Sequence, residues 1–309
     1  MKKSITFNEH FGITEKKTEH LNILMDNDLE AFIDPYHIAN NLGNIIAKKM
    51  YVRSKSFLEK LNRNFIVPND RKNGLVFLSH LGEANEYHLG YSHENKGKGI
   101  GPTKAEVVYD SLSANKFAKA GISVTNEAHN VLLLVKGIGQ DNMSDTLANV
   151  CRDILSDFTL KQCIKYGIDV FETEIEFYDH TEGKWELKKV NLPLYKGKHI
   201  ILVPQFLASG QRVYTNRYNW FISSNYISKE ILNGTIALDS DGEFITELKD
   251  GSKKAIIKNI NKHYRKPKDK LIEFVKTYNG SLIDFQDYVK LNYPSIDLHK
   301  LLDLYNKAS

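Results

Sequence analysis

The chain has 309 residues, 41% hydrophobic and 26% charged, with a formal net charge of +4. These values exclude an intrinsically disordered chain, a collagen-like repeat and a disulfide scaffold, and they suit one large domain or two small ones. Cys151 and Cys163 fall in one long predicted helix, about 18 Å apart and too far for a disulfide. Because no apolar run is long enough for a membrane helix, we expect a cytoplasmic protein with reduced thiols and no membrane partner.

The first third of the chain predicts an arm followed by helices. Residues 1–30 are polar and lack a regular period, so we expect a partly ordered arm. Apolar residues at helical spacing predict a helix over 36–63. Leu75–Ser79 is a short apolar run typical of a buried strand. Thr103, with a glutamate three residues later, forms a capping box that begins a helix over 104–120.

The middle of the chain predicts most of the sheet. Val131–Val135 is a continuous apolar run, as a strand covered on both faces requires. A long amphipathic helix over 142–166 follows it. Phe171–Phe177 alternates apolar and acidic residues, which is the pattern of a strand with one solvated face, and a second strand is expected over 185–190. Ile200–Val203 predicts a further buried strand.

From residue 214 onward the sequence predicts helices, a hairpin near Asp241–Gly242, and a basic C-terminal end. The order of elements predicts a mixed α/β fold, a mixed sheet with flanking helices, for which a restriction-endonuclease-like core is one candidate. The expected divisions are an N-terminal arm over 1–30, an α/β core over 31–247 and a basic helical region over 248–309. Within this last region, helices are expected near 252–263, 268–278 and 281–304.

Positive charge is concentrated in the C-terminal region. Nine Lys and Arg residues lie between positions 249 and 270, against two acidic residues. Such a block could neutralise the phosphates of a nucleic acid, with DNA the expected one, although a solvated helix face is the simpler alternative. The candidate nucleic-acid-binding residues are Lys253, Lys254, Lys258, Lys262, Arg265 and Lys266.

Carboxylates follow two of the predicted strands. Asp141 and Asp145 come after a Gly-Ile-Gly turn at the end of the Val131 strand, and Glu83 and Glu86 leave the end of the Leu75 strand. Ligands bind at the carboxyl ends of strands in open α/β sheets, so the two segments could meet there. Gathered carboxylates would hold Mg²⁺ or Mn²⁺, which could activate water against a phosphodiester. Helix capping by Asp141 is the alternative.

Three further features have both a structural and a functional interpretation. Asp34 before a proline is typical of an N-cap. Lys198, just before the Ile200 strand, is a cation that could face phosphate. The glycine-rich segment Gly97–Gly101 precedes a capped helix and could hold phosphate through its backbone, but it matches no nucleotide-binding fingerprint, and a flexible hairpin explains it equally well.

Four motifs occur in a fixed order: Phe32–Pro35 (FIDP), Ser79–Glu86 (SHLGEANE), Gly137–Asp145 (GIGQDNMSD) and Ile201–Pro204 (ILVP). Together they resemble a widespread group of bacterial proteins of unassigned activity that occurs beside restriction and phage-defence genes. The resemblance extends over about residues 30–290. It implies that one metal site contains Asp34, Glu83, Glu86, Asp141 and Asp145.

The chain departs from that group at Gln205, where the pattern has a lysine after Leu-Val-Pro. If that lysine is catalytic, this copy is impaired or uses Lys198 in its place.

These features together lead us to expect a metal-dependent nuclease, or a nuclease-like subunit, of a bacterial anti-phage defence system. The expected catalytic residues are Asp141, Glu83 and Lys198, with Mg²⁺ or Mn²⁺ as cofactor. The expected partners are nucleic acid and another protein of the defence system. Two other classes stay open: an adaptor that binds partners through the acidic strand Phe171–Phe177 and the basic block, and a nucleotide sensor that uses Gly97–Gly101.

Overall fold

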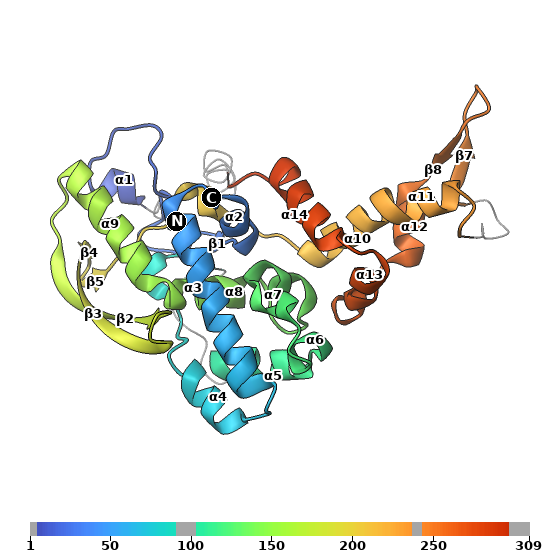
Figure 1. Ribbon diagram of the computed structural model, residues 1–309. Coiled ribbons are helices and arrows are strands. Elements are labelled where there is room, and N and C mark those ends of the chain that lie inside the picture. Colours follow the sequence, from blue (N-terminus) through green and yellow to red (C-terminus); the bar gives the residue numbers. More distant parts are fainter. Residues whose placement is uncertain (1–4, 91–102, 237–242, 297–309) are drawn as a thin grey trace.

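The computed structural model describes residues 5–90, 103–236 and 243–296 (Figure 1). The first half is largely helical and the second half mixes hairpins with helices. The elements up to residue 166 are α1 (Phe7–His10), β1 (Phe32–Ile33), α2 (Pro35–Asn40), α3 (Ile45–Leu61), α4 (Arg71–Leu78), α5 (Lys104–Ala114), α6 (Lys116–Lys119), α7 (Ala128–Leu134), α8 (Gln140–Val150) and α9 (Arg152–Tyr166). The later elements are β2 (Phe171–Asp179), β3 (Lys184–Leu192), β4 (Leu194–Tyr195), β5 (Lys198–His199), β6 (Ala208–Ser209), α10 (Tyr214–Ile222), α11 (Ser228–Leu232), β7 (Ile245–Glu247), β8 (Lys253–Ala255), α12 (Ile257–Tyr264), α13 (Leu271–Thr277) and α14 (Ser281–Asn292).

Capping side chains set the starts of several helices. Asp34 is the N-cap of α2, and Thr103 begins α5 with the predicted capping box. The carboxylate or hydroxyl of such a cap accepts a backbone N–H that the first helical turn leaves unpaired. Asn44 caps α3 in the same way, so the helix predicted over 36–63 is divided at residues 41–44.

The β structure consists of small antiparallel pairs. The longest is the β2–β3 hairpin, which pairs Phe171 with Leu192 and Asp179 with Lys184 and turns at Gly183, where φ is +66°. This hairpin confirms the strands predicted over this part of the chain. The other pairs are β1 with β6, β4 with β5, and β7 with β8. The fold is therefore mixed α/β as predicted. No sheet within the described ranges has more than two strands, so a restriction-endonuclease-like core is not confirmed.

Two of the predicted buried strands are helices. Leu75–Ser79 lies mostly in α4 and Val131–Val135 mostly in α7. Every residue of α7 is buried, and a helix buried on all sides has the same continuous apolar run as a strand covered on both faces. The third segment, Ile200–Val203, is buried but belongs to no sheet. The N–H of Ile201 donates instead to the carbonyl of Glu86 at 2.8 Å.

The helix predicted over 142–166 is divided at Cys151, whose φ of −108° and ψ of 19° interrupt the helical backbone. Asp153 therefore lies in a different helix from Asp145, and it forms an ion pair with Arg53 of α3. Both cysteines are free and buried, as predicted.

The apolar core has two parts. The larger extends from Ile33 to Val289, so the C-terminal helices share it with the preceding part of the chain. The smaller packs Leu21 and its apolar neighbours in the N-terminal segment against Phe158 of α9. Residues 5–30, expected to be a partly ordered arm, contain the short helix α1, and their apolar side chains are part of the core.

The C-terminal region is helical and carries one described hairpin. The hairpin predicted at Asp241–Gly242 lies outside the described residues, as does the predicted helical end at 297–304. The β7–β8 hairpin turns at residues 248–252 instead, and it projects at the end of the molecule opposite α9 and the β2–β3 hairpin (Figure 1). None of the helices in the described ranges combines the length and apolar character that a membrane crossing needs.

Leu133 lies in the last turn of α7 and is fully buried. We expect Leu133→Ala to lower the free energy of unfolding by about 2–5 kcal/mol, because the deletion leaves a cavity in a packed core. Leu291→Ala, on the exposed side of α14, is the matched control and should change this free energy by less than about 0.5 kcal/mol. Urea unfolding measures both values. Equal effects of the two substitutions would contradict the buried position of Leu133.

Candidate functional site

The candidate site is built on helix α8, because several polar side chains of this helix are buried. Its apolar side packs into the core through Met143, Leu147 and Val150. Burying a polar group is unfavourable unless a partner satisfies it, so the buried polar residues determine which segments lie against the helix. Those that are at most 9% exposed are Gln140, Ser144, Asp145, Thr146 and Asn149.

Two of these side chains bind the neighbouring loops. Ser144 Oγ accepts a hydrogen bond from the backbone N–H of Ile33 at 2.9 Å. The Asn149 side-chain amide donates to the carbonyl of Gly82 at 2.9 Å. The FIDP and SHLGE motifs are therefore attached to the helix that follows the GIG motif. The ILVP segment joins them through the bond from Ile201 to the Glu86 carbonyl.

Asp145 forms an ion pair with Lys104, the first residue of α5. The Lys104 side chain is 9% exposed, and its ammonium also lies 3.5 Å from Glu83 Oε1. A cation in the first turn of a helix is unfavourable, because the amino end of the helix dipole is positive. We therefore attribute the buried position of Lys104 to the two carboxylates.

Asp28 and Asp141 belong to the same cluster, and both have a carboxylate oxygen close to Gly90. A Cβ on Gly90 would stand 3.7 Å from Asp141 Oδ1 and 4.0 Å from Asp28 Oδ2, and the φ of +139° at this residue is strained for any side chain. Asp28 is 8% exposed, and its Oδ1 has no hydrogen-bond partner in the described part of the chain. We call Asp28, Glu83, Lys104, Asp141 and Asp145 the Lys104 cluster.

Negative charge is in excess in the Lys104 cluster, with four carboxyl groups around one ammonium. Burial raises the pKa of Asp28 to about 6, and the charges of Asp141 and Glu83 act in the same direction. Burial also raises the pKa of Asp141; Lys104 opposes this shift and Glu83 adds to it. Asp28 therefore changes its protonation state near pH 6.

Of the residues predicted for a metal site, the structure brings together Glu83, Asp141 and Asp145. Glu86 instead pairs with Arg152 of α9, 2.9 Å from its Nε. Within the described ranges, no group of three or more His, Cys, Asp or Glu side chains is arranged to hold a metal ion. The Lys104 cluster supplies oxygen donors of the kind that Mg²⁺ prefers, but in this structure the ammonium of Lys104 is the cation among them.

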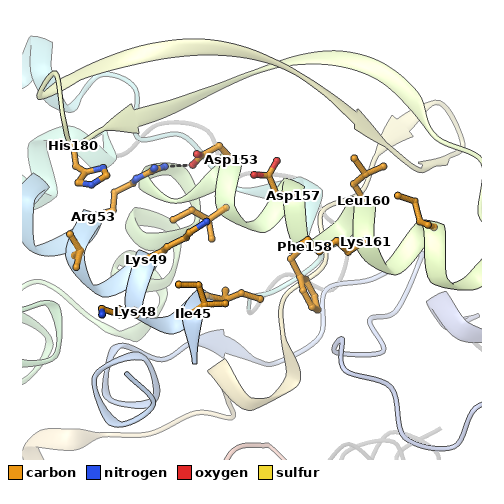
Figure 2. Close-up of a pocket in the computed structure, with 14 residues that line it drawn as sticks. Ile45, Lys48, Lys49, Arg53, Asp153, Asp157, Phe158, Leu160, Lys161 and His180 are labelled. Carbon is orange, nitrogen blue, oxygen red and sulfur yellow. Dashed lines mark hydrogen bonds and ion pairs between the residues drawn. The ribbon is translucent and has the colours of Figure 1, made fainter. Parts of the chain in front are cut away.

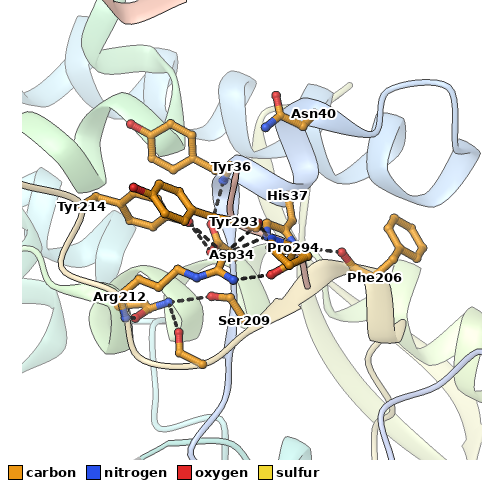
Figure 3. Close-up of polar contacts among 12 residues, drawn as sticks. Asp34, Tyr36, His37, Asn40, Phe206, Ser209, Arg212, Tyr214, Tyr293 and Pro294 are labelled. Atoms are coloured by element: carbon orange, nitrogen blue, oxygen red, sulfur yellow. Dashed lines mark hydrogen bonds and ion pairs between the residues drawn. The ribbon is translucent and has the colours of Figure 1, made fainter. Parts of the chain in front are cut away.

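Asp34 lies in a separate buried network (Figure 3). Its carboxylate accepts hydrogen bonds from the Tyr36 N–H at 2.9 Å and the Tyr214 hydroxyl at 2.6 Å. Arg212 Nη1 is 3.6 Å from Oδ2. Arg212 also donates to the carbonyls of Tyr293 and Pro294, so this network ties α2 to the segment after α14. The structure confirms the capping role of Asp34 and does not include it in the Lys104 cluster.

Lys198 lies on the exposed strand β5, beside His88 rather than in the Lys104 cluster. The pKa of His88 is lowered to about 4, chiefly by burial and further by the charge of Lys198. Gly97–Gly101, the predicted phosphate loop, is outside the described residues. On the acidic strand, Glu172 pairs with Lys189 and Glu176 with His80.

The predicted nucleic-acid-binding residues are all exposed on one projecting part of the molecule. They lie on β8, on α12 and in the two residues after α12, and they make no ion pair with any described residue. This part stands apart from α8 and α9 in Figure 1. The residues concerned are Lys253, Lys254, Lys258, Lys262, Arg265 and Lys266.

Two members of the Lys104 cluster were not predicted from the sequence. Asp28 falls in the segment expected to be an arm, where no periodic pattern marks it. Lys104 carried a usable signal, since a lysine directly after an N-cap opposes the helix dipole and needs a nearby acid.

The chain matches one known protein family. The sequence model of the family described as a domain of unknown function (DUF8370) matches residues 12–216. The chain belongs to this family. The match includes all four motifs and every member of the Lys104 cluster, and it ends within α10, before the basic residues. No curated protein and no solved structure matches the chain.

The raised pKa of Asp28 predicts how stability depends on pH. The unfolded carboxyl loses its proton near pH 4 and the folded one near pH 6, so ionisation of Asp28 destabilises the folded state as pH rises through this window. We expect Asp28→Asn to be more stable than the wild type by about 1–2 kcal/mol at pH 8, after allowance for solvent screening, and equally stable at pH 4.

Urea unfolding at the two pH values measures this difference. Asp26→Asn is the matched control, since Asp26 is exposed, pairs with Lys196 and has a lowered pKa, so its removal should give no gain at pH 8. A gain for Asp28→Asn that is the same at both pH values would refute the assignment.

Proposed function

We propose that the Lys104 cluster is a hydrolytic site that cleaves phosphodiester bonds of nucleic acid, DNA above all, with Mg²⁺ or Mn²⁺. The observation that supports this proposal is the excess of carboxylates in a partly buried site with one oxygen of Asp28 unsatisfied. A buried excess of negative charge is costly, and a divalent cation relieves it directly.

Each member of the cluster has a role in this proposal. Asp141, Asp145 and Asp28 would hold the metal, whose chemistry is to activate a water molecule and to neutralise the phosphate. Glu83, whose side chain is more exposed to solvent, would accept the proton that the water molecule loses. Lys104 leaves Asp145 to stabilise the negative charge that develops on the phosphate, which is the role predicted for Lys198.

The exposed basic residues of the C-terminal region would bind the nucleic acid away from the point of cleavage. Their contribution is electrostatic and independent of base sequence, because they would contact phosphates. The resemblance to proteins encoded beside restriction and phage-defence genes supports the biological setting: a cytoplasmic nuclease subunit of a bacterial anti-phage system that acts with another protein of that system.

Cleavage assays with the purified chain test the reaction. The substrates are supercoiled plasmid, linear duplex, single-stranded DNA and RNA, each with Mg²⁺ or Mn²⁺. We expect Asp141→Asn and Lys104→Met to lower the cleavage rate by about 100-fold or more, the usual loss when a group that stabilises the transition state is removed. Lys198→Met and Asp26→Asn, outside the cluster, should retain the wild-type rate.

Thermal unfolding with and without Mn²⁺ gives a second readout that needs no substrate. We expect Mn²⁺ to raise the Tm of the wild type and to leave that of Asp141→Asn unchanged, because a ligand stabilises only a state that binds it. The proposal fails if Mn²⁺ has no effect on either protein and no substrate is cut. It also fails if cleavage depends on Lys198 and not on Lys104.

The role of the basic residues is tested by the salt dependence of DNA binding. We expect the double variant Lys258→Glu/Lys262→Glu to bind duplex DNA more weakly and to reduce the slope of log affinity against log salt by about 2, since each lost phosphate contact removes about 0.9. Lys116→Glu/Lys119→Glu, on exposed positions of α6, makes the same charge change elsewhere. If both double variants lose equal affinity, the binding is not located in the C-terminal region.

A further inference from the structure

A cavity of about 720 Å³ lies between α3 and α9, beneath the β2–β3 hairpin (Figure 2). Its volume falls within the range of about 300–1,000 Å³ that is typical of small-molecule sites. None of the residues that line it belongs to the Lys104 cluster. An inference about this cavity is therefore independent of the proposed hydrolytic site.

The wall of the cavity is apolar and open to solvent. Ile45 and Val52 of α3 and Ile164 of α9 line it, with exposed fractions of 63%, 44% and 73%. Large apolar side chains that are exposed singly are ordinary, but several around one cavity mark a binding surface. Ile154 and Phe158 continue this wall into the buried core.

The charged groups of the cavity leave a positive excess. Both lining carboxylates are already paired, Asp153 with Arg53 and Asp157 with Lys188 at 2.9 Å. The remaining lining cations have no ion pair with any described residue, and all of them are exposed: Lys48, Lys49 and Lys161.

We propose that this cavity binds a small amphipathic anion, a molecule with an aliphatic body and a carboxylate head. The isoleucines and Phe158 take the body out of water, and the unpaired lysines at the rim bind the head. An amphipathic shape suits this site because its apolar wall and its free cations come from the same two helices. A cationic or uncharged molecule of the same length would gain only the apolar contacts and no attraction to the lysines.

The test is calorimetric titration of the full chain with sodium dodecanoate, below the concentration at which dodecanoate forms micelles. Dodecanol and dodecyltrimethylammonium are the uncharged and cationic comparisons. We expect saturable binding of one dodecanoate per chain and weaker binding of both comparison molecules. Ile164→Glu and the double variant Lys48→Glu/Lys161→Glu should each raise the Kd by about tenfold or more, since they remove the apolar contact or reverse the charge.

Two control variants make the same changes elsewhere. Leu291→Glu alters an apolar side chain that is still more exposed, and the double variant Lys116→Glu/Lys119→Glu reverses two lysines of α6 that lie outside the cavity. Both should keep the wild-type Kd, and thermal unfolding should show that all four variants fold. All of the altered side chains are exposed, so unfolding is not expected.

Three results would overturn the proposal. The first is the absence of saturable dodecanoate binding. The second is an equal loss of affinity in the cavity variants and the control variants. The third is binding of anionic phospholipid vesicles, or of an acidic amphipathic helical peptide, by a wild-type chain that does not bind free dodecanoate, because the occupant would then be a membrane or a protein.

Discussion

The buried polar side chains of α8 are the constraint on which the arrangement of this protein depends. Ser144 and Asn149 need partners because water cannot reach them, and backbone groups of the FIDP and SHLGE segments supply those partners. Asp145 needs a cation, and Lys104 brings the start of α5 to the same place. Segments far apart in sequence thus meet around one helix, which explains why the four motifs are short and separated by long stretches of chain.

Prediction from sequence succeeded where a local signal had one structural solution. The alternation along β2 and the capping box at Thr103 each specify one geometry, and both are present. Prediction failed at α4 and α7, because a short run that is apolar on every side is compatible with a buried strand or a buried helix. The division of one long helix at Cys151 carried no proline or glycine to signal it.

The site was predicted in part, and for a reason that the structure does not support. Glu83, Asp141 and Asp145 do meet, yet no strands deliver them to a sheet edge; they meet because α4 and α7 precede two loops that both pack against α8. Asp28 was missed because long-range packing alone places it there. Lys104 could have been predicted from the sequence, since its position at a helix start is electrostatically unfavourable without the carboxylates around it.

The small net charge of +4 conceals a strong separation of charge. The Lys104 cluster holds more carboxylates than cations, whereas the cavity between α3 and α9 and the C-terminal basic residues carry cations without ion pairs to any described residue. The cost of unpaired charge falls on the buried carboxylates of the cluster, because water screens the exposed lysines. A cation bound at the cluster would relieve that cost. The unpaired carboxylate oxygen of Asp28 at the cluster is therefore the feature that most directly supports our proposal of a bound cation.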